Sequence, residues 1–155
     1  MNKESIIDAL TPVLERLKTL DLTEPGAAKE TLDMEFPLHS EFGDKLRELA
    51  KLGMEEGWLC NREGGPSRFS RVAKPDTGHG FSIDAVFMWG DGPWHKHTKG
   101  EVNCLLAFEG DPAFCGIKEG WGVFEPGSQH VPSVKGGKMM IFYMLPEGAV
   151  EWKKA

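Results

Sequence analysis

Residues 94–101, "WHKHTKGE", place two histidines and a glutamate within a short segment. Alternate side chains of a β-strand point to the same face, so a strand here would put His95 and His97 on one wall. Glu101 has the same parity, although Gly100 interrupts the strand pattern before it. Two imidazoles and a carboxylate suit a divalent metal. Without a ligand from elsewhere in the chain, a solvated charged loop would explain the segment equally well.

A further histidine occurs in residues 125–132, "EPGSQHVP", where His130 follows a proline-glycine turn. The combined pattern is His-x-His-x3-Glu and, about thirty residues later, Pro-Gly-x-x-His. His-x-His alone is common on surface strands, whereas the ordered set of four is far more specific. We therefore predict that His95, His97, Glu101 and His130 bind a divalent metal. Fe, Mn, Ni, Co and Zn all remain open, because geometry rather than ligand type separates them.

The N-terminal part of the chain has a helical pattern up to residue 56. Apolar residues recur every three or four positions between Ile6 and Leu20, which predicts a helix with one apolar face. Pro12 either kinks this helix or begins a second one capped by Thr11. A short helix is expected after "TEPG", and a longer one over 40–57, with Ser40 as its cap and Gly57 as its end.

After Gly57 short apolar runs alternate with glycine- and proline-rich turns, including "EGDP" at 109–112. Candidate strands lie at 58–62, 68–74, 81–89, 101–108, 121–125 and 138–145. Short strands at this spacing are typical of an antiparallel sandwich or barrel. We predict one α+β domain over 1–155, in which a helical segment (1–56) packs on the outside of a β-barrel (57–155).

The two histidine motifs resemble those of the cupin superfamily. The resemblance implies a jelly-roll barrel in which facing strands carry three histidines and one glutamate that bind a metal, with open positions for substrate. It also implies a homodimer. The glycine spacings around the first motif differ by a residue or two from the common form, and Val134 stands where an asparagine is frequent. Neither departure affects a ligand.

The order of segments along the chain is similar to a narrower family, the 4-hydroxylaminobenzoate lyases of nitrobenzoate degradation. The segments that carry this resemblance are "GWLCNREGG", "RFSRVAKP", "FSIDAVFM", "HKHTKGE", "EGDPAFCG" and "EPGSQHVPSVKGGKMMIFYMLPEGAVEW". The resemblance implies conversion of 4-hydroxylaminobenzoate to 3,4-dihydroxybenzoate (protocatechuate) with release of ammonia. The alternatives are another metal-dependent cupin enzyme, such as a dioxygenase or an isomerase, and a non-catalytic cupin that binds an aromatic acid.

An aromatic acid substrate needs a cation for its carboxylate, and an arginine can bind a carboxylate through two hydrogen bonds. Arg62, Arg68 and Arg71 are the candidates. We favour Arg71, because Phe69 and Ala73 would share its face of a strand and could face the barrel interior.

The substrate ring needs flat walls and the reaction needs proton donors and acceptors. Trp94, next to the first histidine motif, is a candidate wall. Tyr143 is the only tyrosine in the chain, and its hydroxyl could reach the pocket. Glu101 could act as general acid or base if it is not a ligand.

Charge, hydropathy and cysteine content indicate which partners and which cellular compartment to expect. The net charge is −6, and no basic cluster suits a nucleic acid. No apolar run reaches the roughly 20 residues of a membrane span. The three cysteines form no Cys-x-x-Cys pair, and there is no pattern of a secretory signal, so we expect reduced thiols and a cytoplasmic protein. Cys104 and Cys115 are expected to be small buried fillers.

Overall fold

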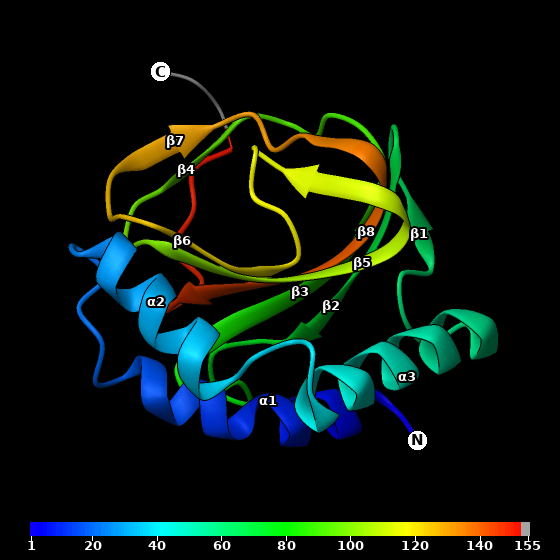
Figure 1. Ribbon diagram of the computed structural model, residues 1–155, viewed down its shortest axis with the longest axis horizontal. Coiled ribbons are helices and arrows are strands. Elements are labelled where there is room, and N and C mark those ends of the chain that lie inside the picture. The colour runs from blue at the N-terminus through cyan, green and yellow to red at the C-terminus, as the bar shows by residue number, and fades with distance from the viewer. Residues whose placement is uncertain (153–155) are drawn as a thin grey trace.

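The computed structural model of the protein describes residues 1–152, and in this range three helices precede eight strands (Figure 1). The helices are α1 (Lys3–Leu17), α2 (Pro25–Glu35) and α3 (Glu41–Glu56). The strands are β1 (Arg62–Glu63), β2 (Ser67–Ala73), β3 (Phe81–Met88), β4 (His95–His97), β5 (Glu101–Phe114), β6 (Gly120–Phe124), β7 (Ser128–His130) and β8 (Val134–Pro146).

The helices form where the apolar spacing predicts them. α1 is a single helix that continues through Pro12, with the buried side chains of Ile6, Leu10 and Val13 on one face. No second helix begins at Pro12, because the apolar face continues on both sides of it. α3 ends at Gly57, whose φ of +83° is a left-handed conformation that glycine adopts without steric cost.

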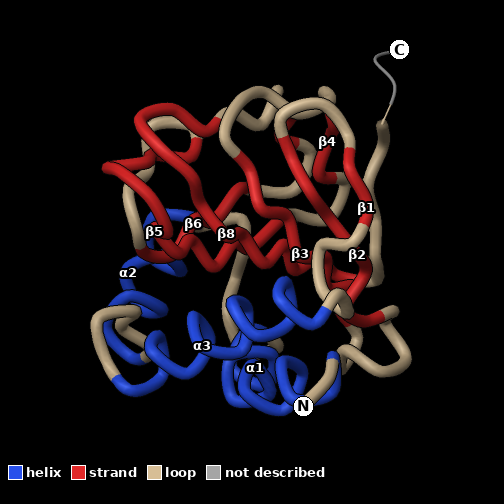
Figure 2. Tube along the Cα trace, turned by 90° about the vertical axis from the view of Figure 1, so that its right-hand side faces the viewer, coloured by secondary structure: helices blue, strands red, loops and turns tan. Residues whose placement is uncertain are grey.

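Six strands form one antiparallel sheet in the order β1-β2-β3-β8-β5-β6, and β4 and β7 form a separate two-stranded sheet. The three helices lie together along one face of the large sheet (Figure 2). Apolar side chains from all three helices and from the helix-facing side of the sheet form a continuous core, which includes Leu10, Leu46, Trp121 and Phe142.

The opposite face of the large sheet turns toward β4 and β7. Its side chains form a smaller apolar cluster that includes Leu105, Phe114 and Ile141. The predicted α+β architecture, a cupin-type barrel with the helical segment packed outside, is confirmed.

Two local predictions were wrong. Strand structure at 58–62 is limited to Arg62, because the chain bends over 58–60 and Cys60 has a left-handed φ of +52°. The turn predicted at 109–112 lies inside β5, where pairing with β8 shifts register on either side of Gly110. Gly110 has a φ of +74°, so glycine and proline are accommodated as a bulge in a long strand instead of a reversal.

None of the helices within residues 1–152 is long and apolar enough to span a membrane.

Candidate metal centre and cavity

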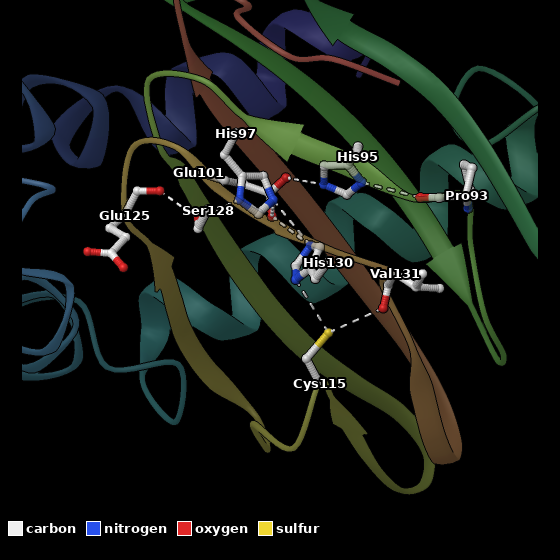
Figure 3. A network of polar contacts seen from close by, with 9 residues as sticks. All are labelled: Pro93, His95, His97, Glu101, Cys115, Glu125, Ser128, His130 and Val131. Atoms are coloured by element: carbon white, nitrogen blue, oxygen red, sulfur yellow. Dashed lines mark hydrogen bonds and ion pairs between the residues drawn. The ribbon is translucent and has the colours of Figure 1, made fainter. Parts of the chain in front are cut away.

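The four predicted ligands converge from two different sheets (Figure 3). Pairing of β4 with β7 places His95 directly opposite His130 and His97 opposite Ser128. The amide of Gly127 donates to the His97 carbonyl oxygen at 2.7 Å, so the proline-glycine turn is tied to the first motif. Glu101 begins β5 in the large sheet and reaches the same point from the other side.

Glu101 lies at the centre of the cluster. Its Oε1 is 2.9 Å from His95 Nε2, and its Oε2 is 3.3 Å from His97 Nε2 and 3.7 Å from His130 Nε2. The Nε2 atoms of His97 and His130 are 3.2 Å apart. The side chains of His95, His97 and Glu101 are almost completely buried, whereas that of His130 keeps a small exposed fraction.

This donor set fits a divalent cation. The four candidate ligand atoms lie within 4.8 Å of one another. Ligand atoms about 2.1 Å from a shared ion lie up to about 4.2 Å apart, so only small side-chain movements would be needed. No described group donates a hydrogen bond to the buried Oε2 of Glu101, which leaves an anionic oxygen available to a cation.

Contacts outside the cluster orient the imidazoles. Ser128 donates its hydroxyl hydrogen to the carbonyl of Glu125, so in the 2.9 Å contact with His97 the donor is the Nδ1–H of the imidazole. His97 Nε2 is therefore the ring nitrogen that faces the cluster. His95 Nδ1 lies 3.4 Å from the carbonyl oxygen of Pro93, and His130 Nδ1 lies 3.7 Å from the sulfur of Cys115. Such outer contacts fix ligand orientation in metal sites.

The protonation states suit metal binding at neutral pH. Burial alone would raise the pKa of Glu101, but its contacts with His95 and His97 outweigh burial, so the pKa lies below its usual range. Burial lowers the pKa of His130 to about 4, against a smaller opposing effect of the Glu101 charge. Glu101 is thus anionic and His130 neutral, as metal ligands must be.

A cavity of about 820 Å³ ends at the cluster, where His95, Glu101 and Tyr143 form part of its wall. Tyr143 lies in β8, and its ring centroid is 6.3 Å from that of His95. Burial, assisted by the negative charge of Glu101, raises the pKa of Tyr143 well above its ordinary value. The phenol therefore stays protonated and can donate a hydrogen bond into the cavity.

The three candidate arginines have different positions. Arg62 and Arg71 line the cavity, together with Lys3 and Lys74. The Nε of Arg71 is 2.7 Å from Oδ1 of Asp84, its cross-strand neighbour, and its Nη2 is 3.4 Å from Oδ2. Arg68 is not among the cavity-lining residues; its guanidinium packs over the ring of Phe87, 5.7 Å from the centroid.

The prediction that Phe69 and Ala73 share a face with Arg71 is only partly correct. Phe69 lines the cavity with Arg71, whereas Ala73 is buried in the helix-facing core. The register of β2 against β3 shifts between Arg71 and Ala73, and this bulge reverses the alternation on which the prediction depended.

The aromatic walls of the cavity come from Tyr143, Phe69 and Trp152. Trp94 is half-buried and is not among the cavity-lining residues. Trp152 was not predicted, because it reaches the site only through pairing of the C-terminal segment, at Glu151, with Lys96 in β4. This pairing brings the Trp152 ring to 5.3 Å from the His95 ring, between centroids.

The cysteines are unpaired, as expected. Cys104 is buried in the core, but the expectation that Cys115 is also buried was wrong. Cys115 lies on the exposed turn after β5, where its sulfur contacts His130. His39 and His79 lie outside the cluster and pair instead with Glu119 and Glu15.

Comparison with known proteins identifies the family of this chain. Residues 10–152 match the model of the family described as "PnbB: 4-hydroxylaminobenzoate lyase". A 4-hydroxylaminobenzoate lyase of Nocardioides sp. (strain LMS-CY) is 33% identical over 162 residues, covering 96% of this chain and 94% of the relative. One of Pseudomonas putida is 31% identical over 173 residues, covering 98% and 97%.

Among solved structures, an RmlC-like cupin from Shewanella frigidimarina is similar at 17% identity with a TM-score of 0.41, covering 55% of this chain and 80% of that one. The match to the family model over residues 10–152 and to both relatives over nearly the whole chain shows that this chain belongs to the 4-hydroxylaminobenzoate lyase family.

Proposed function

We propose that this protein converts 4-hydroxylaminobenzoate to 3,4-dihydroxybenzoate and ammonia, using a divalent metal held by His95, His97, Glu101 and His130. Family membership supports the reaction. The observation that carries the site is the convergence of these four side chains at the inner end of a cavity lined by aromatic and basic residues.

The reaction consumes one water for each substrate. The N–O bond breaks and its oxygen leaves as water, which makes the ring electron-poor. The ring carbon para to nitrogen carries the carboxylate, so a water adds at the ortho carbon and loses a proton. A second water hydrolyses the resulting imine and releases ammonia, and proton transfer within the ring restores the aromatic diol.

When bound, a divalent metal supplies Lewis acidity and lowers the pKa of water. The protein residues place the reactants around it. Tyr143 is protonated at the end of the cavity and can donate a hydrogen bond to the departing oxygen. Phe69 and Trp152 offer aromatic surfaces to the ring.

Arg71 is our proposed partner for the substrate carboxylate. Arg71, Asp84 and Tyr143 are successive members of one cross-strand row, so Arg71 and Tyr143 are separated by two strand spacings, about 10 Å. A benzoate with its nitrogen at Tyr143 can bridge this distance once the side chains are included. Asp84 occupies two of the five N–H donors of Arg71, which leaves donors for the substrate.

The test is product analysis with purified protein and 4-hydroxylaminobenzoate under anaerobic conditions. We expect ammonia and 3,4-dihydroxybenzoate in equal amounts. Substrate that survives long incubation would contradict the proposal, and a requirement for oxygen would favour a cupin dioxygenase.

The ligand set is tested by elemental analysis of the wild type and of His130→Ala. We expect the variant to lose the metal and the activity together. His39→Ala is the matched control, because His39 is an exposed histidine outside the cluster. A variant that keeps its metal would remove His130 from the ligand set.

We further propose a homodimer in the cytoplasm. Free cysteines, one of them exposed, suit a reducing compartment.

The large sheet has edges at β1 and β6 through which two barrels could pair. A sedimentation coefficient that corresponds to a monomer at micromolar concentration would contradict the dimer.

A further inference from the structure

Asn103 is a buried polar residue that the proposed reaction has not used. It lies in β5, two residues after Glu101, and its side chain is completely buried. Both polar atoms of its amide, Nδ2 and Oδ1, lack a hydrogen-bond partner among the described residues. A buried polar group without a partner destabilises the folded state, so a retained one calls for an explanation.

The position of Asn103 points to the metal centre. Residues two apart on a strand share a face and are about 7 Å apart along it, so Asn103 lies next to Glu101 on the same face of β5. Across the sheet, Asn103 pairs with Tyr143 on one side and with Gly122 on the other. It therefore adjoins two of the residues that close the inner end of the cavity.

The Glu101 carboxylate needs a hydrogen-bond donor once a cation is bound. Its Oε2 is the oxygen left available to a cation and its Oε1 relies on His95 as donor, while Asn103 Nδ2 is a buried donor without an acceptor in the described part of the chain. The only hydrogen bond to the carboxylate from a ligand imidazole comes from His95 Nε2, at 2.9 Å from Oε1. A ring nitrogen that binds a cation cannot also donate to Glu101, so a loaded site needs another donor to hold the carboxylate.

We propose that Asn103 is a positioning residue of the metal centre, whose amide donates to the Glu101 oxygen that does not bind the metal. Ligating carboxylates in metal sites are themselves hydrogen-bonded, and removing such a partner typically costs 10- to 100-fold in metal affinity. In the metal-free protein the unpartnered amide of Asn103 lowers stability. In the metal-bound protein it orients the Glu101 carboxylate. This inference rests on the metal site of the proposed function.

The test compares chelator-treated wild type with Asn103→Leu, which keeps the branched shape of the side chain and removes its polar atoms. We expect the metal-free variant to melt at the same temperature as the wild type or higher, since an unpartnered polar group is removed. We expect its affinity for Mn²⁺ or Zn²⁺, measured by competition with a chelator, to fall 10- to 100-fold.

Ser82→Ala is the matched control. Ser82 lies in β3 of the same sheet, is completely buried and also has a polar atom without a partner, but it is not a neighbour of Glu101 on β5. Its removal is expected to leave metal affinity unchanged. Asn103→Ala, which cannot overpack the site, replaces the leucine variant if that variant does not fold.

Unchanged metal affinity in a folded Asn103 variant would overturn the inference. A metal-free leucine variant that melts well below the wild type would also overturn it, because the amide would then be a structural contact. The alanine variant is judged by metal affinity alone, since the cavity it leaves lowers the melting temperature. Metal binding is measured without substrate, so a wild type that binds metal but lacks lyase activity refutes the reaction and not the role of Asn103. A wild type that binds no metal refutes the metal site itself.

Discussion

Each of the three ligand imidazoles has a contact outside the cluster. Ser128 on β7 orients His97, the carbonyl of Pro93 lies beside His95, and Cys115 on the turn after β5 contacts His130. Glu101 contacts all three imidazoles. The geometry of the site therefore depends on these outer contacts as well as on the ligands. Substitutions can be chosen that remove a catalytic group and leave the metal ligands in place.

Replacement of Tyr143 by phenylalanine separates chemistry from metal binding. The hydroxyl is removed while the ring that packs against Phe114 and His95 remains. We expect kcat to fall by about 10²- to 10³-fold, as for the loss of one donor to a developing charge, with metal content unchanged. Steady-state kinetics with elemental analysis is the measurement; full activity would exclude a catalytic role for the phenol.

Stability at alkaline pH is expected to depend on the buried thiol of Cys60. Burial raises its pKa from 9.0 to about 12, so in that interval the folded state keeps a proton that the unfolded state has lost. Stability therefore falls as pH rises above 9, by about 1 kcal/mol between pH 8 and pH 10.

Urea unfolding of wild type and Cys60→Ala at both pH values, with reductant present, measures this effect. The variant should lose about 1 kcal/mol less than the wild type over the same interval. An identical loss in both proteins would show that Cys60 does not contribute.

At the scale of elements, the site depends on the turn that connects the two sheets. Gly100 links β4 to β5, and so His97 to Glu101, with a φ of +98°. A Cβ at this position would lie 3.0 Å from Leu22 Cδ1 and 3.2 Å from the carbonyl oxygen of Phe124. Backbone conformation and space together favour glycine at the point where the chain passes between sheets.

Gly100→Ala should therefore weaken both the fold and the metal site. We expect a loss of about 1–3 kcal/mol in the free energy of unfolding, from the left-handed backbone and the close contacts, and a lower metal affinity. Thermal unfolding and chelator competition measure the two effects.

Gly57→Ala is the control for backbone strain, because Gly57 has a similar φ of +83° and open space around its Cβ position. It should lower stability and leave metal affinity unchanged. If both variants affect the metal equally, the position of Gly100 beside the ligands is irrelevant.

At the scale of the whole molecule, helices and barrel share one core. Leu10 of α1, Leu46 of α3 and Phe142 of β8 belong to the same buried cluster, so the helical segment cannot leave without exposing the sheet. Glu119 strengthens this attachment by accepting from Arg47 of α3 and, at 3.1 Å, from the backbone amide of Ala107 in β5.

We therefore predict that residues 1–155 unfold as one domain. Helix loss followed by far-ultraviolet circular dichroism and exposure of the five tryptophans, among them the buried Trp121, followed by fluorescence should give coincident transitions in urea. Helices that melt before the fluorescence change would contradict a single domain.

Local patterns in the amino-acid sequence were enough to predict the candidate ligands, the helices and most of the strands. Period-two alternation placed His95 and His97 on one face, and the ordered motif identified Glu101 and His130 as their partners. Apolar spacing predicted the helices, and turn residues divided the strands, because these features depend on neighbours within a few positions.

Contacts between distant segments became visible only in the folded protein. Trp152 reaches the cavity through a bridge to β4, Ala73 turns away from Arg71 at a bulge, and the amide of Asn103 is enclosed without a partner beside Glu101. Long-range pairing and register create these placements. They are set by packing of the whole core, which no local period records.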